Sequence, residues 1–187
     1  YKLLASDKPS LGIILNYNNH ENHEDLIQLN SKEKQHSEDI YKDKINIKNK
    51  LNVAFLGAGN YASKILIPSF KLTNVEFNSI ASKTGLSSSY LGRKFKFKEV
   101  TTSADRIIND KANDIIVIAT RHDTHADFIL RAVSQNKHIF VEKPLCINSK
   151  ELMKIKKQYS HSKLLMVGFN RRFSLLSIKL RELMKNK

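Results

Sequence analysis

The chain has 187 residues, 41% of them hydrophobic, and a formal net charge of +14. This length and composition can bury the core of one ordinary domain and a fragment of another. There is no run of about 18 apolar residues that could cross a bilayer, and no basic start followed by an apolar stretch that would mark a secretory signal. We therefore predict a cytoplasmic protein without a membrane partner.

The positive charge raises nucleic acid as a partner, but the distribution of charge argues against it. Residues 1 to 50 hold eight basic and eight acidic side chains, whereas residues 151 to 187 hold ten and two. The excess is mostly scattered lysine, without interleaved aromatic residues. We favour a solvated lysine surface and predict no nucleic-acid partner. Two denser clusters, at residues 93–98 and 170–172, leave an anionic ligand open.

The first 50 residues differ from the rest of the chain. Residues 1–17 contain a turn at 9–12 and an apolar run at 13–15 that is typical of a strand. Residues 18–50 are mostly polar, which predicts a linker or a weakly ordered region of strand and loop. Since the chain begins with Tyr1, we expect it to be a piece of a longer polypeptide, with residues 1–17 as the tail of a preceding domain.

From residue 51 onward, short apolar runs alternate with helical patterns. The predicted strands are at 51–56, 75–81, 99–101, 114–119, 138–141 and 164–167, and the predicted helices at 61–72 (interrupted by Pro68), 84–95, 104–109, 124–135, 149–159 and 175–184. We expect Ser149 to cap the fifth helix, with Leu152 and Ile155 on its inner face. The alternation predicts a Rossmann-like, doubly wound α/β fold over residues 51–168, with a parallel sheet and helices on both faces. In such folds ligands bind beyond the carboxyl ends of the strands.

The first strand runs into a G-x-G-x-x-A turn made by Gly57, Gly59 and Ala62. The first glycine permits a tight turn, the second lets the backbone approach a pyrophosphate, and the alanine allows the helix to pack closely on the strand. A structural turn would use the same residues. Because this turn joins the first strand to the first helix of an alternating chain, we favour dinucleotide binding.

The second strand is followed by Ser82, Lys83 and Thr84, where a site that prefers NAD usually has an acidic residue. Hydroxyl groups and an ammonium suit a 2'-phosphate, and a carboxylate would repel it. This favours NADP over NAD as the cofactor. The alternative is a polar loop whose lysine only faces water.

Thr120, His122 and His125 follow the strand at 114–119, with Asp123 between the histidines. This spacing of the two histidines suggests a metal site, but no other residue nearby in the sequence completes a set of metal ligands. We predict no metal, a wall of the cofactor site at Thr120, His122 and His125, and a helix cap at Asp123 or Thr124.

The strand at 138–141 ends in Glu142, Lys143 and Pro144. A lysine at a strand tip beside a cofactor suits proton transfer to an alcohol or carbonyl oxygen. Glu142 could orient this lysine or hold a ribose, and the Lys143–Pro144 bond is a candidate for the cis form. The alternative is an exposed ion pair of little energetic value.

Together these stretches resemble the Gfo/Idh/MocA family of NAD(P)-dependent oxidoreductases. The matching segments are Val53–Gly59, His125 with Ala132-Val133, Asn136–Leu145 and Val167–Phe173, so that the resemblance covers about residues 51–173. It implies that the pyrophosphate is held by Gly57, Gly59, Asn60, Tyr61 and Ala62. It also implies that Glu142 and Lys143 lie by the nicotinamide ribose and the substrate, with Lys143 catalytic, and that Asn170 and Arg171 begin the substrate side. The family usually has Thr-Pro-Asn where this chain has Thr120-Arg121-His122.

A narrower resemblance is to bi-domain oxidoreductases, in which a zinc-type alcohol dehydrogenase-like half precedes the Gfo/Idh/MocA half; residues 3–15 look like the tail of that first half. The family's substrate domain would then begin at residues 169–187 and continue beyond them. The resemblance implies hydride transfer between a nicotinamide cofactor and a CH–OH carbon of a sugar or nucleotide-sugar. A non-catalytic dinucleotide-binding module is the alternative, and a homo-oligomer is left open.

Overall fold

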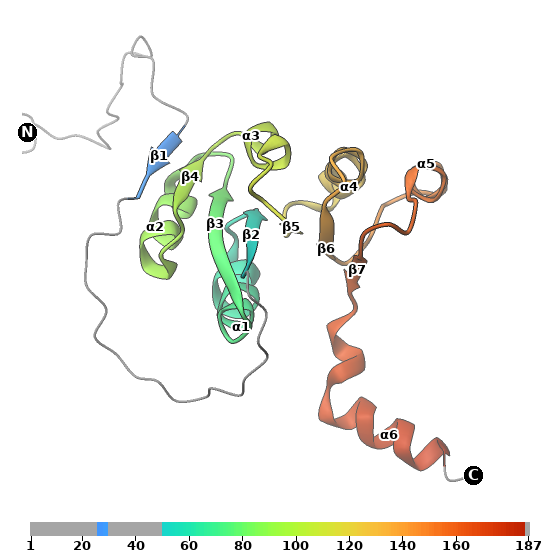
Figure 1. Ribbon diagram of the computed structural model, residues 1–187. Helices are drawn as coiled ribbons and strands as arrows, with labels where there is room; N and C mark the ends of the chain where they lie inside the picture. Colours follow the sequence, from blue (N-terminus) through green and yellow to red (C-terminus); the bar gives the residue numbers. More distant parts are fainter. Residues whose placement is uncertain (1–25, 30–49, 186–187) are drawn as a thin grey trace, which may run out of the picture.

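The computed structural model of the protein describes residues 26–29 and 50–185 (Figure 1). The predicted tail at 1–17 and most of the predicted linker at 18–50 lie outside the described residues. Within that linker region, β1 (Leu26–Gln28) pairs antiparallel with β4 (Glu99–Thr101) and forms one edge of the sheet.

The sheet has seven strands in the order β1-β4-β3-β2-β5-β6-β7. The strands not yet given are β2 (Leu51–Leu56), β3 (Val75–Ala81), β5 (Ile115–Ile118), β6 (His138–Glu142) and β7 (Leu165–Gly168). All pairs except β1 with β4 are parallel. The prediction of a Rossmann-like parallel sheet is confirmed, and each strand predicted from residue 51 onward differs from its observed bounds by one residue at most at either end.

The side chains of each strand contribute alternately to two hydrophobic layers, one on each face of the sheet, because successive residues of a strand point to opposite faces. Ala54 and Leu56 pack with α3 (Ala104–Asn109), α4 (His125–Ser134) and α5 (Ser149–Gln158). Val53 and Phe55 pack on the other face with α1 (Ile67–Lys71) and α2 (Leu86–Phe95). Figure 1 shows the two helix layers on opposite sides of the sheet. This is the doubly wound arrangement that the alternation predicts.

The first helix begins as a π-helical turn, η1 (Ala62–Leu66), before it continues as α1. Pro68 is the physical reason, because it has no N–H to donate to a carbonyl four residues back. The Ile67 N–H instead donates to the Ala62 carbonyl, five residues back. The helix therefore continues through Pro68, and the predicted interruption takes the form of this π-helical turn before the proline.

The fifth helix starts differently from the prediction. Asn148, not Ser149, is the cap: its backbone is extended, and its side-chain oxygen accepts from the Glu151 N–H at 2.9 Å. Ser149 is already in the helix, so its hydroxyl is one position too late to cap it. Leu152 is 40% exposed and only Ile155, at 3%, is buried, so the prediction that both face the core is wrong for Leu152.

A buried polar network closes the amino-terminal end of the sheet. Lys137 donates to the carbonyl oxygens of Asp110 at 2.8 Å and Asn113 at 2.6 Å. The Asn78 amide donates to the Asn113 side chain at 2.7 Å. Burial lowers the pKa of Lys137, although Asp110 and Asp114 oppose this effect. The network is structural and lies at the end of the sheet opposite to that where ligands are expected.

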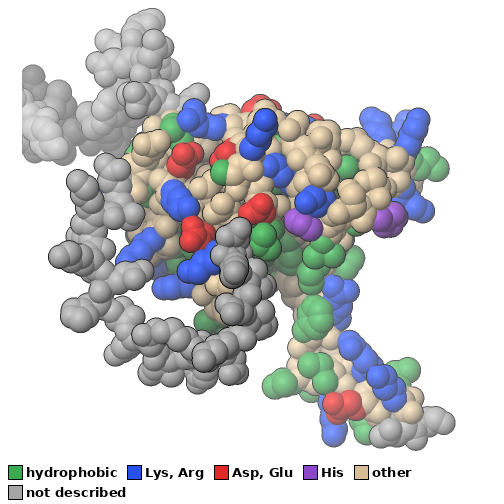
Figure 2. Space-filling model, in the orientation of Figure 1, with side chains coloured by type: hydrophobic (Ala, Val, Ile, Leu, Met, Phe, Trp, Pro, Cys, Tyr) green, Lys and Arg blue, Asp and Glu red, His purple; other side chains and the backbone are tan. Residues whose placement is uncertain are grey.

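The last helix, α6 (Leu175–Lys185), extends away from the body of the sheet and helices (Figure 1). It leaves large apolar side chains in solvent, with Leu175 86% and Leu176 84% exposed, and Figure 2 shows hydrophobic side chains at the surface of this extension. In the described part of the chain, no helix has the length and apolar character needed to cross a membrane.

His138 at the start of β6 should make stability depend on pH. Its Nδ1 accepts a hydrogen bond from the Leu164 N–H at 3.0 Å, so the ring must be neutral there. Burial, then Lys163, lowers the pKa of His138, while Asp114 opposes them. The unfolded chain therefore binds a proton more readily, and the stability present above about pH 6.5 is lost as the pH falls through the folded-state pKa.

We predict that His138→Asn, whose side-chain oxygen can accept the same N–H without titrating, removes this part of the pH dependence. Urea unfolding at pH 8 and pH 5 measures it, and the variant should lose less stability on acidification than the wild type by about 1 kcal/mol. His122→Asn, at an exposed ring, is the control and should leave the dependence unchanged. Equal pH dependence in the His138 variant and the wild type would contradict the assignment.

Candidate active site

The site lies where the order of the sheet reverses, between β2 and β5. From this point the chain builds outward to β3 on one side and to β6 and β7 on the other, which opens a crevice beyond the carboxyl ends of the strands. Two cavities of about 650 Å³ and 620 Å³ occupy this crevice. Ala119 and Thr120 line both, so the two cavities adjoin and can hold the two halves of one extended ligand.

The glycine turn forms the floor of the second cavity. Gly57 has φ of +105°, and an added Cβ would lie 2.3 Å from the Ala119 carbonyl oxygen, so only glycine fits. An added Cβ at Gly59 would meet nothing within 4 Å, so the space beside it is open. Ala62 is buried, with 1% exposure, where η1 meets the strand. These are the three roles that a pyrophosphate cradle requires, and the residues fit a dinucleotide.

The predicted residues after β3 are placed differently from one another. Ser82 and Lys83 line the second cavity, together with Thr102 from the loop after β4 and Phe128 from α4, whereas Thr84 lines neither cavity. The Ser82 Oγ accepts from the Ser88 N–H at 3.2 Å and donates to Ser88 Oγ at 2.9 Å, so it helps to begin α2. Lys83 is exposed and forms no ion pair within the described residues.

Asn60 lies outside both cavities of the crevice. It lines a neighbouring groove of about 580 Å³ with Ser63, Lys64 and Lys94. Its carbonyl accepts from the Ser63 hydroxyl at 3.0 Å.

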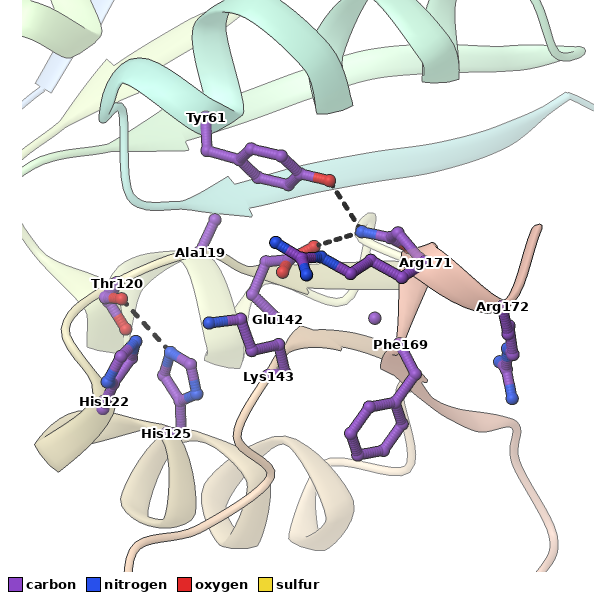
Figure 3. Close-up of a pocket in the computed structure, with 12 residues that line it drawn as sticks. Tyr61, Ala119, Thr120, His122, His125, Glu142, Lys143, Phe169, Arg171 and Arg172 are labelled. Carbon is purple, nitrogen blue, oxygen red and sulfur yellow. Dashed lines mark hydrogen bonds between the residues drawn. The ribbon is translucent and has the colours of Figure 1, made fainter. Parts of the chain in front are cut away.

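The first cavity is lined by the ends of β5, β6 and β7. Its walls include Tyr61, Thr120, Glu142, Lys143 and Arg171, which converge on one space (Figure 3). These residues are up to 110 positions apart in the chain, so the fold brings together most of the residues that the sequence singled out. Arg171 points into this space and Arg172 lies at its edge (Figure 3).

Glu142 is held in place by its neighbours on β7. The parallel register pairs Glu142 with Gly168, and a Cβ on Gly168 would come within 2.6 Å of Glu142 Oε1. Gly168 therefore makes room for the carboxylate. The sequence analysis missed Gly168 as a site residue; the signal that could have found it is its position at the tip of the strand beside β6.

Asn170 joins two other site residues that come from different elements. Its amide nitrogen donates to the Tyr61 hydroxyl at 2.7 Å and to Glu142 Oε1 at 3.1 Å (Figure 3). Tyr61 follows the glycine turn, Glu142 ends β6 and Asn170 follows β7. The bridge therefore spans the crevice from one half of the sheet to the other.

His125 supports the cavity wall from behind. Its ring is fully buried, with Nδ1 2.7 Å from the Pro144 carbonyl oxygen and Nε2 3.2 Å from that of Thr120. It thus connects the loops after β5 and β6, and Pro144 follows a cis peptide bond from Lys143. His122 is exposed at the cavity, with its ring centroid 5.7 Å from that of His125.

Lys143 is exposed in the first cavity, and its ammonium forms no hydrogen bond or ion pair with any described residue.

Thr124 stands at the start of α4, but its hydroxyl donates to the Arg121 carbonyl at 2.7 Å and gives no side-chain cap to the helix. Asp123 lies one position earlier, in the 3-10 turn η2 (His122–Thr124). Of the two predicted cap positions, Thr124 is therefore the N-cap residue of α4, although its side chain makes no capping hydrogen bond, and Asp123 is not. Over residues 26–29 and 50–185, no three His, Cys, Asp or Glu side chains gather into a group that could hold a metal ion.

Comparison with protein families gives a match over residues 51–169, to the profile described as "Oxidoreductase family, NAD-binding Rossmann fold" and named for Gfo, Idh and MocA. The chain belongs to the Gfo/Idh/MocA oxidoreductase family. The matched region contains the glycine turn and the Glu142-Lys143-Pro144 segment. The predicted cofactor class, NAD or NADP, is therefore confirmed at the level of the family.

Curated relatives of this Gfo/Idh/MocA chain include inositol dehydrogenases. The inositol 2-dehydrogenase of Rhizobium meliloti is 48% identical over 61 residues, which are 32% of this chain and 18% of the relative. The myo-inositol 2-dehydrogenase of Thermotoga maritima is 31% identical over 81 residues, 43% of this chain and 24% of the relative. The chain thus spans about a fifth of the length of the curated relatives that it matches.

Solved structures share the fold. The 3-ketoreductase KijD10 of Actinomadura kijaniata, solved with NADP and TDP-benzene, superposes with a TM-score of 0.67 at 18% identity, over 74% of this chain and 43% of KijD10. Levoglucosan dehydrogenase, solved with NADH and levoglucosan, gives a TM-score of 0.66 at 23% identity, over 74% of this chain and 40% of that enzyme. At these identities the likeness supports the fold.

The two glycines of the turn should respond differently to the same substitution. Gly57→Ala forces a Cβ against a backbone carbonyl at a positive φ, so we expect it to lower the free energy of unfolding by more than about 1 kcal/mol. Gly59→Ala enters open space and should leave stability within about 0.5 kcal/mol of the wild type.

Gly59→Ala should nevertheless weaken NADH binding by at least about tenfold, because its methyl group occupies the space that a pyrophosphate needs. Urea unfolding and fluorescence titration with NADH measure the two effects. Undiminished NADH affinity in a stable Gly59 variant would show that no phosphate approaches this backbone.

Proposed function

We propose that the chain is the cofactor-binding part of an NAD(P)-dependent oxidoreductase that transfers a hydride to or from a CH–OH carbon of a sugar-like substrate. One observation carries the proposal: the glycine turn and the Glu142–Lys143 pair line two adjoining cavities at the switch point of the sheet. If the glycine turn were only structural and the Glu142–Lys143 pair only a surface ion pair, nothing would require both to lie in the same crevice.

The second cavity fits the adenosine half of the cofactor, and the first fits the nicotinamide half. Gly57, Gly59 and Tyr61 would hold the pyrophosphate, with Asn60 and Ala62 shaping the turn. Glu142, Thr120 and His122 would face the nicotinamide ribose, with His125 behind them. When bound, the cofactor accepts or delivers the hydride. The protein supplies binding, orientation and a proton-transfer group.

Lys143 is the proposed catalytic residue. Its ammonium is exposed in the first cavity and forms no bond to any described residue, so it is available to a substrate oxygen. An alcohol must lose its proton as its carbon loses a hydride, and a carbonyl must gain one in reverse. Lys143 can hold that proton at Nζ and exchange it with the substrate oxygen. Glu142 beside it adds a negative charge to the same wall.

We propose residues 51–168 as the dinucleotide-binding domain and residues 169–187 as the start of a substrate domain. The exposed apolar side chains of α6 support this division, because a helix with such a surface normally packs against further structure. The family resemblance puts Asn170 and Arg171 at the start of the substrate side, and Arg171 would act there. Inositols, levoglucosan and TDP-linked compounds are named for the relatives, and a sugar or nucleotide-sugar is the corresponding substrate class here. The proposed setting remains the cytoplasm.

NADP is the preferred cofactor in this proposal. Lys83 and Arg121 line the second cavity and no acidic residue of the described chain does, so a 2'-phosphate would meet cations and no carboxylate. Because the Ser82 hydroxyl is engaged by Ser88 and Thr84 lies outside the cavity, Lys83 would carry most of the preference among the three residues that follow β3.

A second candidate function is a dinucleotide-binding module without turnover. The observation that favours it is that Lys143 forms no hydrogen bond or ion pair with any described residue, so no described side chain orients it for proton transfer. The two candidates share the cofactor site and differ in whether Lys143 acts on a substrate.

Replacing Lys143 distinguishes them. With myo-inositol and NAD⁺ or NADP⁺ as probes, Lys143→Met should reduce turnover at least about 100-fold, because a positioned proton-transfer group contributes factors of this size. NADPH affinity should change less than about twofold, because this lysine faces the substrate. Lys111→Met, at an exposed lysine remote from the crevice, is the control. Turnover that survives Lys143→Met contradicts the catalytic role, and a wild-type chain that binds cofactor without turnover supports the module.

The cofactor preference has its own test. Lys83→Glu should weaken NADPH binding by about tenfold or more, since a carboxylate replaces the cation beside the 2'-phosphate, and should affect NADH much less. Fluorescence titrations with both cofactors measure the ratio, with Lys111→Glu as the matched change of charge elsewhere. A ratio that Lys83→Glu leaves unchanged would remove NADP as the preferred cofactor.

A further inference from the structure

We propose that Asn170 is a positioning residue of the cofactor site, which fixes the Glu142 carboxylate and the Tyr61 phenol for the nicotinamide half of the dinucleotide. This inference rests on the proposed function. It moves Asn170 from the substrate side, where the family resemblance puts it, to the cofactor side.

The donors of the Asn170 amide are fully used. Its nitrogen has two hydrogens, one for Tyr61 Oη at 2.7 Å and one for Glu142 Oε1 at 3.1 Å. A carboxylate can only accept, so the nitrogen and not the oxygen of the amide must face Glu142. Asn170 therefore has no N–H left to donate to a substrate.

The two partners are left with groups that a ligand can use. The Tyr61 hydroxyl accepts from Asn170, so its own proton remains free to be donated. In the described part of the chain, Glu142 Oε2 has no hydrogen-bond partner, while Oε1 is bound by Asn170. One acceptor oxygen and one hydroxyl donor are thus presented to the first cavity, which both residues line. Ribose hydroxyls and phosphate oxygens are groups that such a pair can bind.

The carboxylate cannot easily take another position. Gly168 lies opposite Glu142 in the sheet, and its missing Cβ leaves the space that Oε1 occupies. Glu142 is therefore fixed by the strand, by the shape of Gly168 and by the Asn170 hydrogen bond. A charge-assisted hydrogen bond of this kind is stronger than a neutral one, and a carboxylate held in advance loses less entropy when it binds a hydroxyl.

The bridge also connects the cofactor site to the segment that leads into α6. Asn170 opens the 3-10 turn η3 (Asn170–Phe173), and α6 begins two residues after that turn. A ligand that rearranges Glu142 or Tyr61 would thus act directly on the start of the proposed substrate domain.

The test compares two ligands in the full chain. NADH should occupy both cavities, whereas ADP should occupy only the second, which contains neither Glu142 nor Asn170. We expect Asn170→Ala to weaken NADH binding about tenfold, the size of one lost hydrogen bond to a charged group, and to change ADP affinity less than twofold. Asn170→Asp, which puts a second carboxylate against Glu142, should weaken NADH further. Asn109→Ala, at an exposed asparagine of α3, is the control.

A double-mutant cycle shows whether Asn170 acts through Glu142. In a Glu142→Ala background, Asn170→Ala should weaken NADH by a clearly smaller factor than in the wild type, because no carboxylate remains to be positioned. Equal losses of NADH and ADP affinity would mean a general structural role and would overturn the inference, as would unchanged NADH affinity in Asn170→Ala. A wild-type chain that binds none of NADH, NADPH and ADP would instead overturn the proposed function.

Discussion

The register of the parallel strands fixes where every functional side chain lies. Leu56 pairs with Ile118, Ile118 with Val141 and Val141 with Val167, so a row of apolar residues, three of them buried and Val167 partly buried, crosses these four strands. One position further along these strands come Gly57, Ala119, Glu142 and Gly168. The hydrophobic core thus ends at the row where the chemistry begins. A slip of one residue in any strand would turn that strand's inward side chains to the opposite face, so the burial of the core also fixes the geometry of the site.

Close approach of backbones holds this row together. Gly57 lies against the Ala119 carbonyl, and Gly168 lies against the Glu142 carboxylate. His125 reaches from beneath to the Thr120 and Pro144 carbonyls. The loops after β2, β5 and β6 are therefore held in place before a ligand binds, which reduces the conformational entropy that is lost on binding. The buried polar network around Lys137, at the opposite end of the sheet, stabilises that end and takes no part in the crevice.

Much of this arrangement could be read from the sequence. Apolar runs buried on both faces identify parallel strands without knowledge of their partners, and the G-x-G-x-x-A turn locates the first tip of the sheet. Gly168 and the role of Asn170 could not be read, because both depend on which residue of β6 lies opposite which residue of β7. The cap of α5 is Asn148, one position before the predicted Ser149, because both residues are capable of capping and only backbone geometry selects between them. Thr124 does occupy the N-cap position of α4, but its hydroxyl bonds to the Arg121 carbonyl and not to the helix. The hydroxyl of Ser82 looked free in sequence but is engaged by Ser88.

The central claim is that one dinucleotide spans both cavities along this row. Amide chemical-shift changes in ¹⁵N–¹H spectra of the chain, recorded with NADH and with ADP, test it most directly. With ADP, the account predicts shifts at Gly57, Gly59 and Lys83. With NADH, it predicts the same shifts and further ones at Glu142, Lys143 and Asn170. Shifts confined with both ligands to the opposite end of the sheet, around Asn113 and Lys137, would contradict it.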